Sequence, residues 1–179
     1  MSERRYAGSI ERLRHPDRLA LLEVDKVLEH CLEASIRRVL DVGTGSGIFA
    51  EAFVARGLEV SGLDIAEAML EAAQAYVPQA HFLLGSIEQL PFDDASMDMV
   101  FMGHVLHESD DIVQSLREAA RVASQRIAVL EWPYQDEERG PPLDHRLEPE
   151  RVQDALSQAQ LPQARSIAME HMALYIIDL

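Results

Sequence analysis

The sequence has one cysteine, few basic residues and no long apolar run, and each shortage excludes a class of protein. Cys31 stands alone, so no disulfide bond can form within the chain. A single thiol is typical of proteins from a reducing cytoplasm, which is where we expect this one. No stretch approaches the roughly 18 apolar residues of a membrane helix, and the N-terminal region lacks the apolar core of a signal peptide. We therefore expect neither a membrane span nor secretion.

Basic residues are outnumbered by acidic ones almost two to one. The 16 lysines and arginines face 31 aspartates and glutamates, which gives a formal net charge of −15. Nucleic-acid binding draws most of its affinity from basic side chains that neutralise phosphates, and a surface of this charge repels polyanions. We expect a small-molecule ligand and no nucleic acid. The 179 residues suit a single domain, residues 1–179, whose core needs no disulfide or metal.

Short apolar segments alternate with segments of helical pattern along most of the chain. We expect strands at residues 37–42, 58–64, 81–84, 97–102 and 126–131. Helices are expected between and after them, at residues 48–56, 66–76, 112–123 and 149–160. This alternation implies right-handed crossovers, and so an α/β fold in which helices cover both faces of a parallel sheet. Two further strands, near 164–170 and 172–178, are so close in sequence that only an antiparallel hairpin can join them.

Three other segments have their own patterns. Residues 1–16 are polar with mixed charge, which predicts a flexible segment that a ligand could order. From Pro16 to Leu32 apolar residues recur every three or four positions, which predicts a helix. Residues 132–146 contain three prolines and one glycine and form the one long irregular segment. Loops of that length in a compact domain are usually functional, so we expect an active-site loop here.

Glycines at positions 43, 45 and 47 separate the first expected strand from the following helix. They allow the backbone to approach a ligand closely at the positive N-terminus of a helix. The dinucleotide fingerprint would need a further glycine at position 48, which is Ile48, and Asp41 does not suit a pyrophosphate. A nicotinamide-dependent oxidoreductase is therefore disfavoured. A carboxylate two residues before the first glycine suits a cationic ligand such as S-adenosylmethionine, which carries an ammonium and a sulfonium.

Asp64 lies at the end of the second expected strand, 23 residues after Asp41. A carboxylate at this place can accept hydrogen bonds from both hydroxyls of a ribose. The alternative is a cap for the helix that follows, since aspartate is a favoured N-cap. The expected position in the same crevice as the glycines favours ribose binding.

Four motifs in this order resemble those of the class I S-adenosylmethionine-dependent methyltransferases. They are VLDVGTGSG at residues 39–47, GLD at 62–64, GSIEQLPF at 85–92 and VLHE at 105–108. The chain is most similar to the small-molecule branch that includes the ubiquinone- and menaquinone-biosynthesis C-methyltransferases. The resemblance implies a three-layer Rossmann-like fold with a seven-stranded sheet in the order 3-2-1-4-5-7-6, strand 7 antiparallel. It also implies S-adenosylmethionine as cofactor, S-adenosylhomocysteine as product and a small-molecule methyl acceptor.

The resemblance also assigns roles to residues of the four motifs. The methionine part of the cofactor would face the carboxylate and loop residues Asp41, Gly43, Thr44, Gly45 and Gly47. The nucleoside would contact Asp64 at the ribose and Ile65, Ser86 and Ile87 at the adenine. The family usually has an aspartate at the position of Ser86. A hydroxyl also accepts hydrogen bonds, with about half the strength of a charged partner.

His104 and His107 follow the fourth expected strand, at the edge where open parallel sheets bind ligands. Methyl transfer is an in-line displacement that relies on positioning, so a base is needed only when the acceptor must lose a proton. Either histidine could be that base. His104 is our first candidate and also a candidate contact of the cofactor, while His107 is the weaker candidate and is expected in the substrate pocket. Position 111 is Asp111 rather than a second histidine, so the zinc-protease motif is absent and we expect no metal.

The irregular segment supplies the remaining candidates for the substrate pocket. Trp132 and Tyr134 would form an apolar wall for the acceptor, with Arg146 beside them and His145 as a second candidate base. A solvated loop is the alternative interpretation of these residues.

Two hypotheses of different classes follow. One is a methyltransferase that acts on a small molecule, and the other is a catalytically silent cofactor-binding subunit that works through a partner protein. Ser86 and the absence of an obvious base motivate the second. Turnover of S-adenosylmethionine to S-adenosylhomocysteine distinguishes them.

Overall fold

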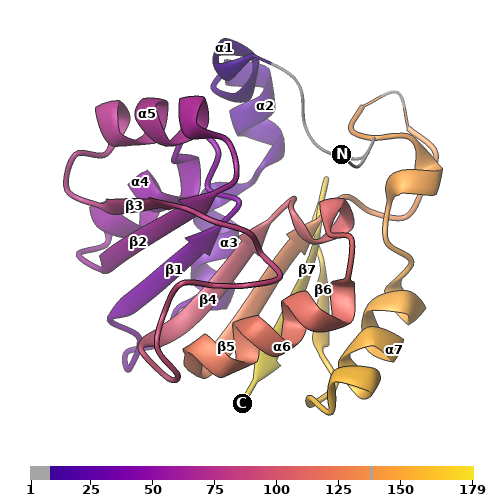
Figure 1. Cartoon of the computed structure of the whole chain (residues 1–179). Coiled ribbons are helices and arrows are strands. Elements are labelled where there is room, and N and C mark those ends of the chain that lie inside the picture. Colours follow the sequence, from indigo (N-terminus) through magenta and orange to yellow (C-terminus); the bar gives the residue numbers. More distant parts are fainter. Residues whose placement is uncertain (1–8, 138) are drawn as a thin grey trace.

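A seven-stranded sheet forms the middle layer of the computed structural model, which describes residues 9–137 and 139–179 (Figure 1). The strand order is β3-β2-β1-β4-β5-β7-β6. The strands β1 to β5 pair in parallel, and β7 pairs antiparallel with both β5 and β6. The expected order and hairpin are therefore confirmed. The strands are β1 Arg38–Val42, β2 Glu59–Asp64, β3 His81–Leu84, β4 Met97–Gly103, β5 Ala123–Glu131, β6 Arg165–Ala168 and β7 Ala173–Asp178.

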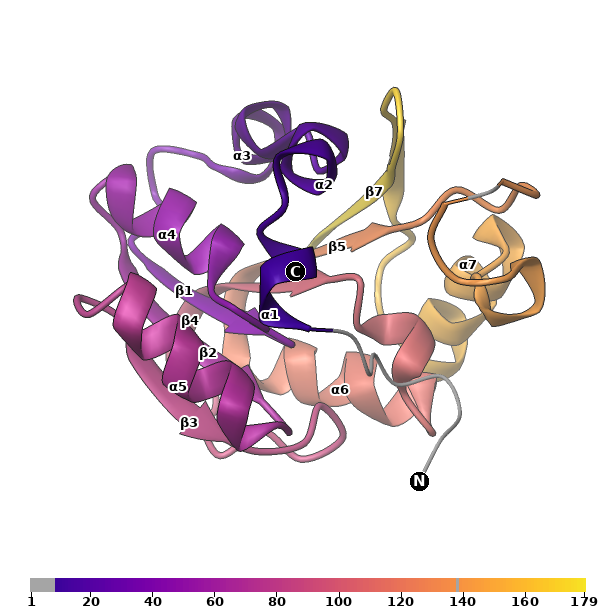
Figure 2. The ribbon, with the colours of Figure 1, turned by 90° about the horizontal axis from the view of Figure 1, so that it is seen from above.

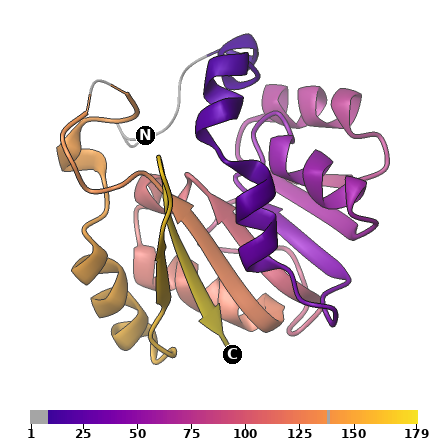
Figure 3. The same cartoon turned by 180° about the vertical axis from the view of Figure 1, so that it is seen from behind.

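Helices cover both faces of the sheet, as Figures 2 and 3 show. One face carries α3 Val24–Cys31, α4 Ile48–Ala55 and α5 Glu67–Tyr76, and the other carries α6 Ile112–Val122 and α7 Pro149–Ala159. Successive strand residues point to opposite faces, so β4 supplies both apolar layers. Met99 and Phe101 pack toward α3 and α4, while Val100 and Met102 pack toward α6 and α7. Strands buried on both faces explain why the apolar runs in the sequence are nearly continuous.

The predicted helix from Pro16 to Leu32 is two helices, α2 Pro16–Leu21 and α3 Val24–Cys31. The break lies at Glu23, which has a left-handed backbone with φ 47°. Its carboxylate accepts a hydrogen bond of 3.0 Å from the backbone N–H of His171 and one of 2.7 Å from Nζ of Lys26. A contact with a residue distant in sequence thus accompanies a break that the local pattern does not indicate.

The described part of the segment expected to be flexible, residues 9–16, contains regular structure. Residues Ile10–Leu13 form a short helix, α1, whose first turn is capped by the hydroxyl of Ser9. Leu13 is buried, and the guanidinium of Arg14 donates a hydrogen bond of 2.8 Å to the carbonyl of Ser46. Residues 1–8 lie outside the described residues. None of the helices in the described ranges is both long and apolar enough to cross a membrane.

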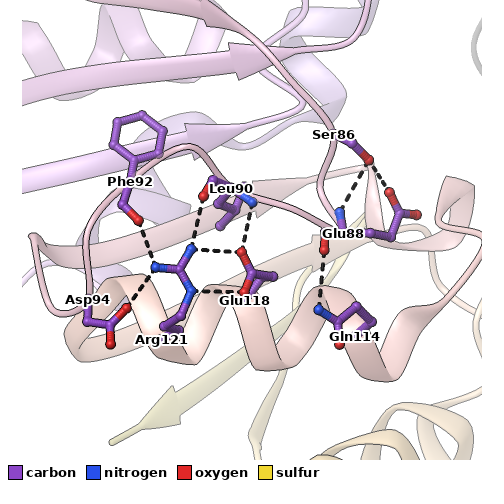
Figure 4. Close-up of polar contacts among 8 residues, drawn as sticks. All are labelled: Ser86, Glu88, Leu90, Phe92, Asp94, Gln114, Glu118 and Arg121. Carbon is purple, nitrogen blue, oxygen red and sulfur yellow. Dashed lines mark hydrogen bonds and ion pairs between the residues drawn. The ribbon is translucent and has the colours of Figure 1, made fainter.

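The loop between β3 and β4 is held against α6 by one arginine (Figure 4). The guanidinium of Arg121 donates to the carbonyls of Leu90, at 2.9 Å, and Phe92, at 2.7 Å. Glu118 pairs with Arg121 at 2.8 Å and accepts the backbone N–H of Leu90 at 2.9 Å. Carbonyls in an irregular segment need partners, and here one side chain supplies two. The loop therefore has a fixed path along α6 between the end of β3 and the start of β4.

Replacing Arg121 by alanine should lower the free energy of unfolding by about 2 kcal/mol, because loop carbonyls lose donors that are charged. Urea denaturation of both proteins measures the difference. Arg117→Ala is the matched control, since Arg117 lies on the same helix and donates only one exposed hydrogen bond, to Gln158. A loss for Arg121→Ala no larger than for the control would contradict the proposed role, because exposed ion pairs contribute about 0–1 kcal/mol.

Candidate functional site

A cavity of about 840 Å³ opens at the carboxyl edge of the sheet. In Figure 2, which looks onto this edge, α1 lies over the strand ends, and the segment after β5 stands across from α1 and α2. The volume is within the roughly 300–1,000 Å³ of ligand pockets. The cavity brings together most of the residues selected from the sequence: Asp41, Gly43, Thr44, Gly45, Asp64, Ile65, Ser86, Ile87, His104, His107 and Trp132.

The glycine loop is shaped by hydrogen bonds to the end of β2. The carbonyl of Leu63 accepts the backbone N–H groups of Gly43, at 2.8 Å, and Thr44, at 3.0 Å. Gly43 has φ 69°, and a Cβ there would lie 2.5 Å from Cγ2 of Val105, so only glycine fits. The loop thus has its shape before any ligand binds.

Gly47 is the exception among the predicted cofactor contacts, because it is not among the residues that line the cavity. It has φ 79°, and a Cβ on it would lie 3.2 Å from Cβ of Ala73. Gly47 therefore allows close packing of the loop on α5 rather than contact with a ligand.

Asp41 is the residue before the last in β1 and is 2% exposed. Its carboxylate accepts a hydrogen bond of 2.7 Å from the hydroxyl of Thr44. Burial raises the pKa of Asp41 to about 7, because a charged carboxylate is poorly solvated there. A bound cation would offset that cost, so the residue suits a positively charged ligand.

Asp64 at the end of β2 connects three backbone segments. Its Oδ2 accepts the N–H of Gly45 at 2.8 Å, and its Oδ1 accepts the N–H of Ala66 at 2.9 Å. The N-cap of α5 is Ala66, so Asp64 is not the helix cap that the sequence left open. Each carboxylate oxygen has a second acceptor site, which leaves capacity for the two hydroxyls of a ribose.

Ser86 lies beside an acidic residue that sequence reasoning missed. The hydroxyl of Ser86 donates to the carboxylate of Glu88, which also accepts the hydroxyl of Ser109 at 2.9 Å. Burial opposes ionisation of Glu88, yet hydrogen bonds, including those from Ser86 and Ser109, hold its pKa below the usual value. With its proton directed to Glu88, the oxygen of Ser86 is left as an acceptor for an amino group such as that of adenine.

His104, the first candidate for a base, packs between Trp132 and Met172. Its ring stacks on Trp132 with centroids 5.0 Å apart, and its Nε2 lies 3.1 Å from Sδ of Met172. Burial lowers the pKa of His104 to about 3, and the positive charges of Arg18 and His107 act in the same direction. The ring is therefore neutral near pH 7 and too weakly basic for efficient proton abstraction.

His107 is held by a buried glutamate at the end of β5. Glu131 Oε2 lies 2.8 Å from Nδ1 of His107, and Oε1 accepts the backbone N–H of His107 at 3.1 Å. Burial would raise the pKa of Glu131, but the charge and hydrogen bonds of His107 outweigh it and the pKa is lowered. Glu131 was not selected from the sequence. Its signal is the one that identified Asp41 and Asp64, an acidic residue at the carboxyl end of a parallel strand.

Three predicted pocket residues, Tyr134, His145 and Arg146, do not line the cavity. The buried guanidinium of Arg146 donates to the carbonyls of Pro133 and Pro141, both at 2.9 Å. These bonds fold the segment onto itself, so that Tyr134 lies on the outside, 42% exposed. Trp132 does line the cavity, as do the described residues Arg139, Gly140 and Pro141 of the same segment.

Comparison with known proteins agrees with this geometry. Residues 40–126 match the sequence model of a family described as a methyltransferase domain. The malonyl-[acyl-carrier protein] O-methyltransferase of Serratia marcescens is 40% identical over 93 residues, which cover 52% of this chain and 36% of that protein. The demethylmenaquinone methyltransferase of Thermotoga maritima is 34% identical over 110 residues, which cover 59% of this chain and 48% of that protein. The chain thus spans less than half the length of either relative.

A solved structure extends the likeness to nearly the whole chain. The crystal structure of a SAM-dependent methyltransferase from Aquifex aeolicus superposes with a TM-score of 0.84 at 26% identity, covering 94% of this chain and 96% of that one. The chain has the fold of the class I S-adenosylmethionine-dependent methyltransferases, and its residues 40–126 match the methyltransferase domain family. S-adenosylmethionine is the cofactor that this family and fold imply. The buried carboxyl of Asp41 and the carboxylate of Asp64 fit its ammonium and its ribose.

Asp64→Ala should weaken binding of S-adenosylhomocysteine about 10- to 150-fold, the effect of losing hydrogen bonds to a charged group. Titration calorimetry on the folded variant measures it. Asp25→Ala is the control, because it removes an equal charge from an exposed position on α3. Unchanged affinity in the Asp64 variant would remove the ribose assignment.

Binding of S-adenosylhomocysteine should strengthen as the pH rises through about 7, because the free protein holds a proton on Asp41 below that value. The ligand's ammonium favours the carboxylate, so binding at low pH must release this proton. Between pH 8 and pH 6 we expect the affinity to fall about tenfold, the effect of one pKa unit. Asp41→Asn should flatten the profile. Calorimetry at three pH values gives the answer, and equally steep profiles for both proteins would contradict it.

Proposed function

We propose that the protein transfers the methyl group of S-adenosylmethionine to a small molecule bound in the cavity at the carboxyl edge of the sheet. The observation that carries the proposal is the continuity of this cavity. It runs from Asp41 and Asp64, which suit the cofactor, to the stacked rings of His104 and Trp132. The two relatives named above act on different acceptors, so the likeness supports the reaction type and not the acceptor.

The chain contributes position and exclusion of water. When bound, S-adenosylmethionine supplies a methyl carbon that its sulfonium already activates for displacement. Asp41 would hold the ammonium and Asp64 the ribose, which would fix the donor against the glycine loop. The neutral ring of His104 and the indole of Trp132 form a wall that keeps water from the reacting atoms. Orientation of this kind can supply a large part of a rate enhancement without a base.

His107 is the polar group that the acceptor would meet. Glu131 engages its Nδ1, and its Nε2 lies 4.0 Å from Oε1 of Glu108, a residue that also lines the cavity. Glu131 thereby acts as a positioning residue for His107. The catalytically silent subunit remains the competing hypothesis, and it predicts binding of the cofactor without turnover.

The proposal predicts transfer of labelled methyl from S-adenosylmethionine to a component of an ultrafiltered metabolite extract, with formation of S-adenosylhomocysteine. Trp132→Ala should lower this turnover while changing the affinity for S-adenosylmethionine by no more than about 1 kcal/mol, since its role is at the acceptor wall. Mass spectrometry and calorimetry measure the two effects.

Tyr134→Ala is the matched control, because Tyr134 is an aromatic residue of the same segment that lies outside the cavity. Equal effects of the two substitutions on turnover would contradict the proposed contact between Trp132 and the acceptor. Tight binding without turnover would favour the silent subunit, and label in tRNA, DNA or protein at higher rates would contradict a small-molecule acceptor.

A further inference from the structure

The charged residues that line the cavity carry both signs. Asp41, Asp64 and Glu88 lie at or just after the ends of strands, and Asp17 and Glu108 are further acidic lining residues. Three arginines also line the cavity, and they come from the two segments that stand over the strand ends. These arginines are Arg12, Arg18 and Arg139. A cationic cofactor matches the carboxylates at the strand ends, and the arginines match a ligand of opposite charge.

The helical pair α1–α2 is fixed in place, so its arginines face the cavity in a defined way. Arg14 bonds the carbonyl of Ser46, pairs with Glu51 at 2.8 Å and lies 3.6 Å above the ring of Tyr76. Arg14 is therefore used to fasten α1 to the cofactor side. Arg12 and Arg18, one on either side of it in sequence, line the cavity.

Arg18 and Arg139 belong to the part of the cavity beyond the cofactor residues. The Nε of Arg18 is buried, and its charge acts on the ring of His104, which stacks on Trp132. Arg139 precedes Gly140, whose backbone packs so closely on Trp132 that a Cβ would lie 2.7 Å from the indole. Both arginines thus lie close to the aromatic wall from different elements, α2 and the segment after β5.

We propose that the methyl acceptor is a small organic anion, a carboxylate or a phosphate ester, whose charged group binds Arg18 and Arg139 while its apolar part lies on Trp132. The planar fork of an arginine matches both groups with paired hydrogen bonds. The cofactor carries one carboxylate of its own. Arg12 suits that carboxylate, because the adjacent Leu13 lies against Gly45 of the glycine loop, 3.5 Å from where a Cβ would be.

The proposal rests on the proposed function, and one experiment separates the two. A metabolite extract is split on an anion exchanger into a retained pool and a flow-through pool, and each is incubated with the protein and S-adenosylmethionine. We expect S-adenosylhomocysteine to form with the retained pool. Formation with the flow-through pool alone would overturn the anionic acceptor and leave the methyltransferase intact. Formation with neither pool would overturn both.

Substitutions then assign the arginines. Arg18→Gln and Arg139→Gln should each lower turnover of the retained pool about 10- to 150-fold, the effect of losing a charged hydrogen bond. Arg139 is exposed, so its substitution leaves the packing of the core intact. The affinity of both variants for S-adenosylhomocysteine should stay within about threefold. Arg37→Gln, at the opposite edge of the sheet, is the control of equal charge. A parallel loss of S-adenosylhomocysteine affinity would mean that these arginines serve the cofactor, which would overturn the proposal.

Treatment of the retained pool with alkaline phosphatase identifies the source of the charge. Loss of turnover after treatment indicates a phosphate ester, and unchanged turnover indicates a carboxylate. Either result supports an anionic acceptor.

Discussion

The site depends on the contact between the glycine loop and the end of β2. Leu63 accepts two backbone N–H groups of the loop through its carbonyl, and Asp64 accepts a third, that of Gly45, through its carboxylate. These bonds satisfy donors that the turn would otherwise leave unpaired. They also hold Asp41 beneath the loop, where burial makes its charge costly. The cofactor side of the cavity is therefore rigid and electrostatically prepared for a cation.

Buried acidic groups are the main electrostatic feature of this chain. Asp41 and Glu131 both lie at strand ends with almost no exposure, but their hydrogen-bond partners differ. Glu131 has a partner in His107 and keeps its charge, whereas Asp41 has one hydroxyl and its pKa is raised. A buried carboxyl that lacks a cationic partner is a common mark of a binding site. This difference is why we propose a positioning role for Glu131 and a ligand-binding role for Asp41.

Arginine side chains give the irregular segments their shape. Arg121 donates to carbonyls of the loop after β3, and Arg146 does the same for the segment after β5. In both cases a guanidinium offers several donors to backbone that has no regular partner. The consequence for the site is that Ser86 and Trp132 have defined positions, and that Tyr134 is turned away from the cavity.

Local patterns in the sequence were sufficient for the strands, most helices, the glycine loop and the placing of Asp41 and Asp64 at strand ends, because periodicity and turn chemistry act over a few residues. The sheet order and the cofactor came from the resemblance that those motifs carry.

Contacts between distant residues decided the rest. Glu23 meets His171 and breaks the predicted helix, and Glu131 meets His107 to form the polar side of the pocket. Arg146 bonds carbonyls of its own segment, so that neither it nor Tyr134 lines the cavity. Burial keeps the ring of His104 neutral. Each of these depends on which groups meet when the core closes, because hydrogen-bond partners and local polarity exist only in the folded chain.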